Sequence, residues 1–312
     1  DLDLLPIIKR RALAGKKTLI EYNDNFYSPA AASPVATAWG SPILIQSYER
    51  FMQEGDALLV TGPGLQRLFS EKVETPIHIL RNHLPNELQT FEAVWEEPKD
   101  EIRIGIAGSL GHMSDYMALA PSLRILFDMF PNVKLHVMGN ESLPSILGLP
   151  DDRVRFTPWG SMKEYFNFLR PLHLGLAPLL DTPYNLCRSD VKALELASCG
   201  VAPILPNVLP YQDFLQQTQI PAYSNFSGMI ELVSNLLREP HSIRTVAEKC
   251  FEYAKTDRIG IKKRERLHLF SQFLPEAPGA YQWPMAAAIT SSAAAQKTKR
   301  ERLPFYKKLK SC

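Results

Sequence analysis

Strand-like segments that are apolar nearly throughout alternate with helix-like segments along most of the chain. This pattern constrains the fold more than any other feature, because a strand without polar alternation must be covered on both faces. The strands expected in the second half are 102–108, 133–139, 153–159, 172–178 and 201–206. The helices expected there are 115–130, 161–169, 189–198, 227–237 and 242–254. Such alternation predicts an α/β fold with a doubly wound parallel sheet.

The N-terminal part repeats the alternation on a smaller scale. We expect strands at 17–22, 57–62 and 76–80, and helices over 2–14, over 41–53 and from Pro63 onward. The acidic segment 92–101 lacks periodicity and is interpreted as a linker. A chain of 312 residues fits two domains that face a cleft. The predicted domains are 1–97, small or truncated, and 98–255, followed by a C-terminal helix and basic tail over 256–312.

The charge distribution disfavours a nucleic-acid-binding body. The net charge is +2, but the last 17 residues hold seven Lys or Arg and one Glu, so the rest of the chain is near −4. Nucleic-acid-binding domains usually carry a concentrated positive face. We expect residues 297–310 to be a solvated segment, with contact to anionic lipid or an acidic partner as the alternative.

Cysteine spacing and hydropathy indicate the cellular compartment in which the protein is expected. The four cysteines show neither metal-site spacing nor the density of a disulfide framework, and no apolar run is long enough to span a bilayer. We therefore expect a cytoplasmic protein without a metal site. The chain begins with Asp1 rather than Met, which suggests that it has been cut or processed.

A glycine-rich junction, "GIAGSLGHMSDY", joins an expected strand to an expected helix. It contains Gly108, Ser109 and, at the helix start, His112. Free backbone N–H groups and the positive end of a helix dipole suit a phosphate there, and His112 could donate to a phosphate or sugar oxygen. Tight strand-to-helix turns also need glycine, so a purely structural role stays open.

A second junction, "CRSDVKALELASCG", crowds charges at the start of a helix. If the helix begins near Ser189, then Arg188 and Ser189 lie at its N-terminus and Lys192 lies one turn into it. Glu195 follows three residues later, on the same face of the helix. The cations would hold a diphosphate and the carboxylate a ribose. The alternative is an exposed pair of Asp190 with Lys192 and a solvated Glu195.

Three segments together resemble one protein family. "GLAPLLDTPYNLCRSDVKALELASCGVAPIL", "IRIGIAGSLGHMSDY" and "VKLHVMG" are similar to the donor-binding half of retaining glycosyltransferases of family 4, also called group 1. The resemblance covers 102–213 well and 22–85 more loosely, and the combination is far more specific than any one motif. It implies the GT-B fold, in which two Rossmann-like domains face a cleft.

The resemblance also implies roles for single residues. Glu195 matches the second Glu of the family's E-x7-E motif, which contacts the donor ribose, and Lys192 matches the basic residue of its "SDxK" pattern. Gly108 and Ser109 match the loop beside the phosphates. The first Glu of the motif falls on Cys187, whose thiol cannot accept hydrogen bonds from sugar hydroxyls as a carboxylate does. The loop residues Asp181 and Asn185 are the candidates to take over that role.

The expected activity is therefore transfer of a sugar from a nucleotide-diphosphate sugar, with retention and without metal or cofactor. Lys192, Glu195 and Arg188 are the expected catalytic residues, and Asp24 and Asn25 are expected on the acceptor side. The N-terminal part lacks the family's first strands, so either the natural chain continues upstream or the acceptor side is reduced. The rival hypothesis is a non-catalytic GT-B-like module that binds nucleotide, glycan or protein.

Overall fold

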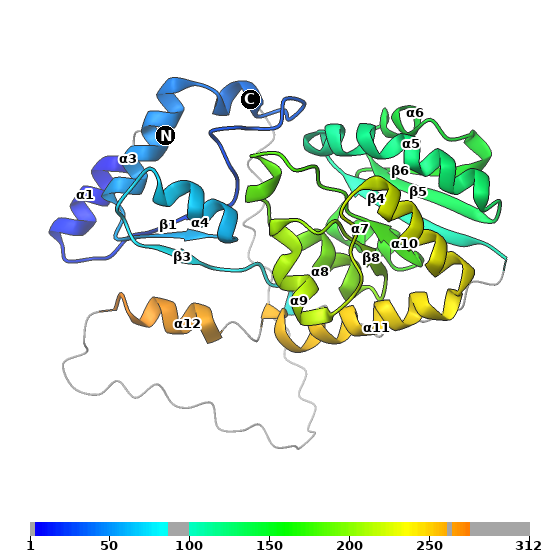
Figure 1. Cartoon of the computed structure of the whole chain (residues 1–312). Coiled ribbons are helices and arrows are strands. Elements are labelled where there is room, and N and C mark those ends of the chain that lie inside the picture. Colours follow the sequence, from blue (N-terminus) through cyan, green and yellow to red (C-terminus); the bar gives the residue numbers. More distant parts are fainter. Residues whose placement is uncertain (1–3, 87–99, 261–263, 275–312) are drawn as a thin grey trace, which may run out of the picture. The chain divides into compact units, whose positions relative to one another are not determined.

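The computed structural model describes residues 4–86, 100–260 and 264–274, and Asp1–Phe273 form one compact unit (Figure 1). We call residues 4–86 together with 264–273 the N-terminal lobe, and residues 100–260 the C-terminal lobe. Most of the expected linker and the whole basic tail lie outside the described residues, so the expectations for them stay predictions.

The N-terminal lobe is built on a small parallel sheet. Its strands are β1 (Leu19–Tyr22), β2 (Ala57–Val60) and β3 (Ile77–Ile79), in the order β1-β2-β3. Its first helices are α1 (Leu5–Leu13), α2 (Ala36–Trp39), α3 (Pro42–Glu54) and α4 (Pro63–Ser70). The predicted strands and the long helices are confirmed, and proline starts α3 and α4, where its missing N–H costs nothing.

Both faces of this sheet are covered, which explains why β2 is apolar throughout. Leu58 and Val60 pack in a cluster with side chains of α3 and α4, such as Met52 and Phe69. Leu59 points to the other face, where it clusters with Leu80 and Leu269. Leu269 belongs to α12 (Arg264–Ser271), a helix that follows the C-terminal lobe in the chain.

The C-terminal lobe contains the larger sheet. Its strands are β4 (Ile102–Gly108), β5 (Val133–Gly139), β6 (Val154–Pro158), β7 (Leu174–Leu176) and β8 (Ala202–Ile204). All neighbours are parallel, in the order β6-β5-β4-β7-β8. The order reverses between β4 and β7, and ligands of such sheets bind beyond the carboxyl ends at the reversal. The predicted doubly wound sheet is confirmed for this lobe, whereas the three described strands of the N-terminal lobe run in sequential order.

Helices cover this sheet on both faces (Figure 1). They are α5 (Met113–Met129), α6 (Leu143–Leu147), α7 (Met162–Leu169), α8 (Val191–Ser198), α9 (Gln212–Thr218), α10 (Phe226–Arg238) and α11 (Pro240–Asp257). Helix α5 packs against α6 and α10, and α8 packs against α11. Ser161 and Glu164 form a capping box that starts α7 where the sequence predicts it. The short helices α6 and α9 escaped prediction because neither is long enough to show a helical period.

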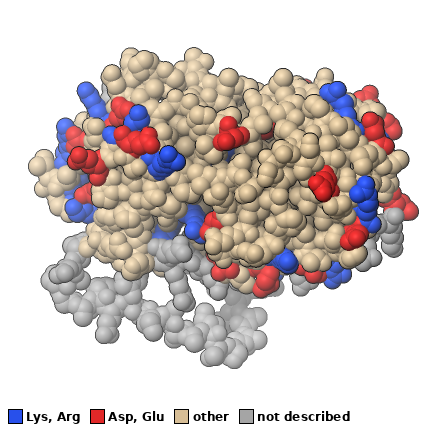
Figure 2. Space-filling model, viewed as in Figure 1, with Lys and Arg blue, Asp and Glu red and all other residues tan. Residues whose placement is uncertain are grey.

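Three properties of the described residues bear on function. On the face shown in Figure 2, positive and negative side chains are interspersed. No helix within residues 4–86, 100–260 and 264–274 has both the length and the apolar character needed to cross a membrane. The same residues hold no cluster of three or more His, Cys, Asp or Glu side chains arranged for a metal ion.

Candidate functional site

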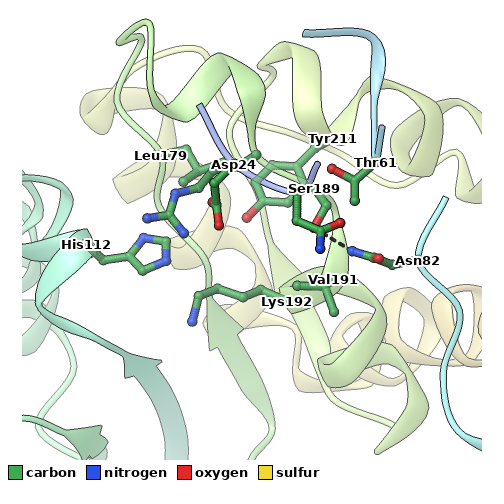
Figure 3. A pocket seen from close by; sticks show the side chains of 11 residues that line it. Asp24, Thr61, Asn82, His112, Leu179, Ser189, Val191, Lys192 and Tyr211 are labelled. Carbon is green, nitrogen blue, oxygen red and sulfur yellow. Dashed lines mark hydrogen bonds between the residues drawn. The ribbon is translucent and has the colours of Figure 1, made fainter. Parts of the chain in front are cut away.

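A pocket of about 210 Å³ lies at the carboxyl ends of both sheets (Figure 3). Residues that follow β1, β2 and β3 line it from the N-terminal lobe, and residues that follow β4, β7 and β8 line it from the C-terminal lobe. The lining residues are Asn23, Asp24, Thr61, Asn82, His112, Leu179, Arg188, Ser189, Val191, Lys192 and Tyr211. Of the predicted site residues, the structure brings together Asp24, His112, Arg188, Ser189 and Lys192.

The junction before α8 differs from the prediction. The helix begins at Val191, two residues later than expected, and Arg188 is extended after a 3-10 turn over Asn185–Cys187. Asp190 does not cap the helix with its side chain. Its carboxylate instead accepts hydrogen bonds from Nη1 and Nη2 of Arg258 at 2.7 and 2.9 Å, and both residues are buried. The alternative of an exposed Asp190–Lys192 pair is therefore wrong.

Lys192 lies in the first turn of α8 and reaches across to β4, where its Nζ donates to the carbonyl oxygen of Ala107. Burial lowers the pKa of its ammonium group to about 8, although Glu195 raises it; Arg188 also lowers the pKa. A cation that has lost much of its hydration gains most from an anionic ligand. Lys192 is therefore the strongest candidate of the pocket for binding a phosphate oxygen.

His112 is buried beside Asp115, with Nδ1 at 3.0 Å from the carboxylate oxygen Oδ2. Burial lowers the pKa of His112 to about 4, Asp115 opposes this shift, and Lys192 and Arg188 add to it. The ring is therefore neutral at pH 7. Because a carboxylate only accepts, the ring proton is assigned to Nδ1, which leaves Nε2 as an acceptor. In this form His112 cannot make the predicted donation to a phosphate or sugar oxygen.

Asp115 also organises the loop after β7, a role that the sequence interpretation missed. Its Oδ1 accepts hydrogen bonds from the backbone N–H of Leu180 at 2.9 Å and from Nδ2 of Asn185 at 2.8 Å. Asn185 is buried and also donates to the carbonyl of Leu180. Its predicted contact with sugar hydroxyls is replaced by this structural role. The only sequence signal for Asp115 was its position three residues after His112.

Arg188 is held by two contacts that leave part of its guanidinium unpaired. Nη2 donates to the carbonyl of Gly111 at 3.3 Å, and the guanidinium carbon lies 4.6 Å from the centre of the Tyr184 ring. Its Nε is buried and has no partner among the described residues. A buried donor without an acceptor is costly, so it marks a place where an anion or a water is expected.

Gly108 and Ser109 lie near the turn after β4 but not among the residues that line the pocket. A Cβ on Gly108 would lie 1.7 Å from the hydroxyl oxygen of Tyr116, so packing of this tyrosine requires glycine. Tyr116 donates to the carbonyl of Ala107, the same acceptor that Lys192 uses. Ser109 is exposed. The glycine thus serves the packing beneath Lys192, which is the structural role left open above.

Glu195 lies apart from the pocket lining. Its Oε2 accepts a hydrogen bond at 2.7 Å from the hydroxyl of Tyr165 on α7. Burial raises the pKa of Glu195, against the lowering effects of Tyr165 and Lys192. Contact with a ribose therefore requires sharing or displacing the Tyr165 hydroxyl, a partner that the sequence did not indicate.

Cys187, at the position of the first Glu of the resembling motif, points into the core of the N-terminal lobe. It packs in the cluster of Phe26 and Met52, and burial raises the pKa of its thiol to about 11. The segment that carries Cys187 packs closely on α4 only because residue 64 is a glycine: a Cβ on Gly64 would lie 1.9 Å from the carbonyl oxygen of Leu186. The thiol is thus a packing group of the contact between the lobes.

Two further predicted residues are placed away from the pocket. Asn25 is buried and forms an Asx turn, accepting from the backbone N–H of Tyr27 and Ser28 while its amide donates to the carbonyl of Pro183 at 3.1 Å. The buried side chain of Asn25 thus holds a turn and the loop at Pro183, and it does not make the predicted contact with the acceptor. Asp181 is exposed outside the pocket lining.

No protein-family model matches this sequence, and no curated protein matches it. Solved structures do. Anabaena HepE, solved in complex with UDP and glucose, superposes with a TM-score of 0.63 at 11% identity, covering 88% of this chain and 77% of that one. Sucrose-phosphate synthase of Thermosynechococcus elongatus gives 0.59 at 18% identity, covering 81% and 67%. WaaG, a glycosyltransferase involved in lipopolysaccharide biosynthesis, gives 0.55 at 16% identity, covering 84% and 80%. The predicted GT-B fold is confirmed by these similarities.

Proposed function

We propose that the protein is a glycosyltransferase that takes a sugar from a nucleotide-diphosphate sugar, with retention of configuration. The observation that carries this proposal is the convergence of the two cations Lys192 and Arg188 on one pocket at the strand-order reversal. The resemblance of the sequence to family 4 enzymes and the UDP bound in the HepE structure support it.

The diphosphate is assigned to the cationic side of the pocket. Lys192 supplies a partly desolvated ammonium, Arg188 supplies the unpaired Nε, and His112 lines the same side. Gly108 and Ser109 lie at the adjoining turn, and Ser189 contributes a hydroxyl. The ribose is assigned to Glu195 and Tyr165, and Asp181 is kept as a candidate for the sugar.

The transfer then needs little covalent help from the protein. The acceptor oxygen forms a bond to the anomeric carbon on the same face from which the diphosphate oxygen departs, so the configuration is retained. The acceptor proton passes to the departing diphosphate. Lys192 and Arg188 stabilise the negative charge that grows on the diphosphate, and preorganised charges of this kind are typically worth about 100- to 1,000-fold in rate.

A non-catalytic module that binds nucleotide or glycan is the second candidate. The position of Cys187 favours it, because the thiol is buried in the N-terminal lobe and supplies no carboxylate to a sugar. The two candidates differ in turnover, not in binding.

Calorimetric titration with UDP, GDP, ADP and their common sugar conjugates tests the proposal. We expect one nucleotide to bind, Lys192→Ala to weaken its binding about 10- to 100-fold, and Glu195→Ala to weaken it less. Lys163→Ala, which removes an exposed lysine of α7, is the matched control. Binding without hydrolysis or transfer would favour the module, and no binding by any nucleotide would refute both forms of the donor site.

We further propose domain limits at 1–97 and 98–255, with a C-terminal helix and basic tail over 256–312. In this proposal the tail is not part of the donor site. Deletion of residues 297–312 is expected to leave nucleotide affinity unchanged, and a large loss would contradict the assignment.

A further inference from the structure

The N-terminal lobe contributes a chemically distinct side to the pocket. Asn23 and Asp24 follow β1, Thr61 follows β2 and Asn82 follows β3, so each strand of the small sheet contributes at its carboxyl end. Figure 3 shows Thr61 and Asn82 at one end of the pocket and His112 at the other. The end of the pocket at Thr61 and Asn82 is therefore polar and uncharged, and it lies opposite the histidine end.

Thr61 provides the most specific sign of a ligand on this side. The residue is only 6% exposed, and its hydroxyl is buried without a hydrogen-bond partner among the described residues. Unpaired buried hydroxyls are rare, and one that lines a pocket is expected to be completed by a ligand or a water. A hydroxyl both donates and accepts, so its natural complement is another hydroxyl.

The two lobes also contribute different charges to the pocket lining. The lining residues from the N-terminal lobe include one carboxylate, Asp24, and no Lys or Arg. The lining cations, Lys192 and Arg188, come from the C-terminal lobe. Asn82 is also neutral, and its Nδ2 donates to Oγ of Ser189 at 2.9 Å. Asp24 lies toward the other end, near the Tyr184 ring on which Arg188 stacks. The end at Thr61 and Asn82 therefore has neither a lining carboxylate nor a lining cation to hold a second anionic group.

We infer that the acceptor group bound on this side is a neutral polyol, such as an unphosphorylated sugar ring, with Thr61 as a contact residue. That the bound group is the acceptor of a transfer rests on the proposed function, but its binding chemistry rests on Thr61 and Asn82. It excludes sugar phosphates, because the lining residues at this end supply no cation for a second phosphate. Anionic chemistry is confined to the side of Lys192 and Arg188.

Saturation-transfer difference NMR tests this inference without any nucleotide. Inorganic pyrophosphate is added to occupy the cationic side, and methyl α-glucopyranoside and glycerol are compared with glucose 6-phosphate and glycerol 3-phosphate. We expect the neutral probes to bind and the phosphorylated ones not to compete. Thr61→Val, which keeps the shape and removes the hydroxyl, should weaken the neutral probes about three- to tenfold. Thr61→Ser, which keeps the hydroxyl, is the matched control.

The outcomes separate this inference from the proposed function. Phosphorylated probes that bind as well as neutral ones, neutral probes that ignore Thr61→Val, or neutral probes that do not bind at all would each overturn it. Asn82→Lys gives a second variant, and it should admit the phosphorylated probes, because it places a cation at this end of the pocket. Failure to bind any nucleotide in calorimetry would refute the proposed donor and leave these results untouched.

Discussion

Asp190 and Lys192 lie two residues apart and meet opposite environments. Asp190 is paired with Arg258, whose guanidinium makes five hydrogen bonds, two to Asp190, two to the carbonyl of Asn82 and one to Tyr253. Lys192 has an ammonium with a lowered pKa and donates to the carbonyl of Ala107. A charge with all its partners supports the fold, whereas a charge short of partners is held for a ligand. Charge alone therefore does not identify a site; the state of the partners does.

The largest effect is expected where a fully paired charge is broken. Arg258→Met leaves the Asp190 carboxylate buried and unpaired, which typically costs about 3–5 kcal/mol of unfolding free energy. Urea titration followed by circular dichroism measures it. The double variant Asp190→Leu with Arg258→Met should recover most of the loss. A loss below about 1 kcal/mol for the single variant would mean that the pair is not structural.

In contrast to Arg258→Met, Lys192→Gln should weaken nucleotide binding without lowering the unfolding free energy. We expect nucleotide affinity to fall about 10- to 100-fold, because a charge-assisted hydrogen bond is lost. The folded pKa of Lys192 is lowered below its unfolded value, so its charge costs stability in full below pH 8. That cost is gone above the unfolded pKa of about 10.4. The unfolding free energy of Lys192→Gln at pH 7 should therefore equal or exceed that of the wild type. A lower value would mean that Lys192, like Asp190, stabilises the fold.

The pH dependence of binding sharpens the comparison further. Because the free ammonium of Lys192 has a pKa of about 8, nucleotide affinity should fall about tenfold per unit above that pH. His112, with a pKa of about 4, stays neutral over this range. Calorimetry from pH 6 to 10 measures the profile. Lys192→Arg should bind with a flat profile, since arginine stays charged; an unchanged slope would assign the titration to another group.

The smallest effect is expected at Cys187. Its thiol packs in the N-terminal core, so Cys187→Ala should cost about 1 kcal/mol of unfolding free energy and leave nucleotide affinity unchanged. Thermal unfolding and calorimetry measure the two quantities. Reduced affinity in a fully folded variant would show that the thiol reaches the ligand after all.

The strands and long helices were predictable because their apolar periods are local. Strands β4 and β5 agree with prediction residue for residue, because each has a mostly apolar run that ends at a glycine, Gly108 or Gly139. The start of α8 was not predictable, because Arg258 lies 68 positions away and decides how Asp190 is used. Long-range partners of this kind leave no trace in a local pattern.

The site was predictable to the same degree. Lys192, Arg188 and His112 meet in the pocket because the carboxyl ends of parallel strands share one edge of the sheet. The burial of Cys187 in the opposite lobe and the binding of Glu195 by Tyr165 depend on tertiary packing. A motif can place a residue on an element, but only the neighbouring elements decide which way it faces.

Helix α12 has a consequence for how the chain is made. The face of the small sheet that holds Leu59 and Leu80 is closed by Leu269, which follows Leu59 by 210 residues and Leu80 by 189. During synthesis the first strands must therefore wait, with one apolar face open, until the whole C-terminal lobe has left the ribosome. Early strands are thus exposed to misassociation for most of translation, and truncation before α12 would make that exposure permanent.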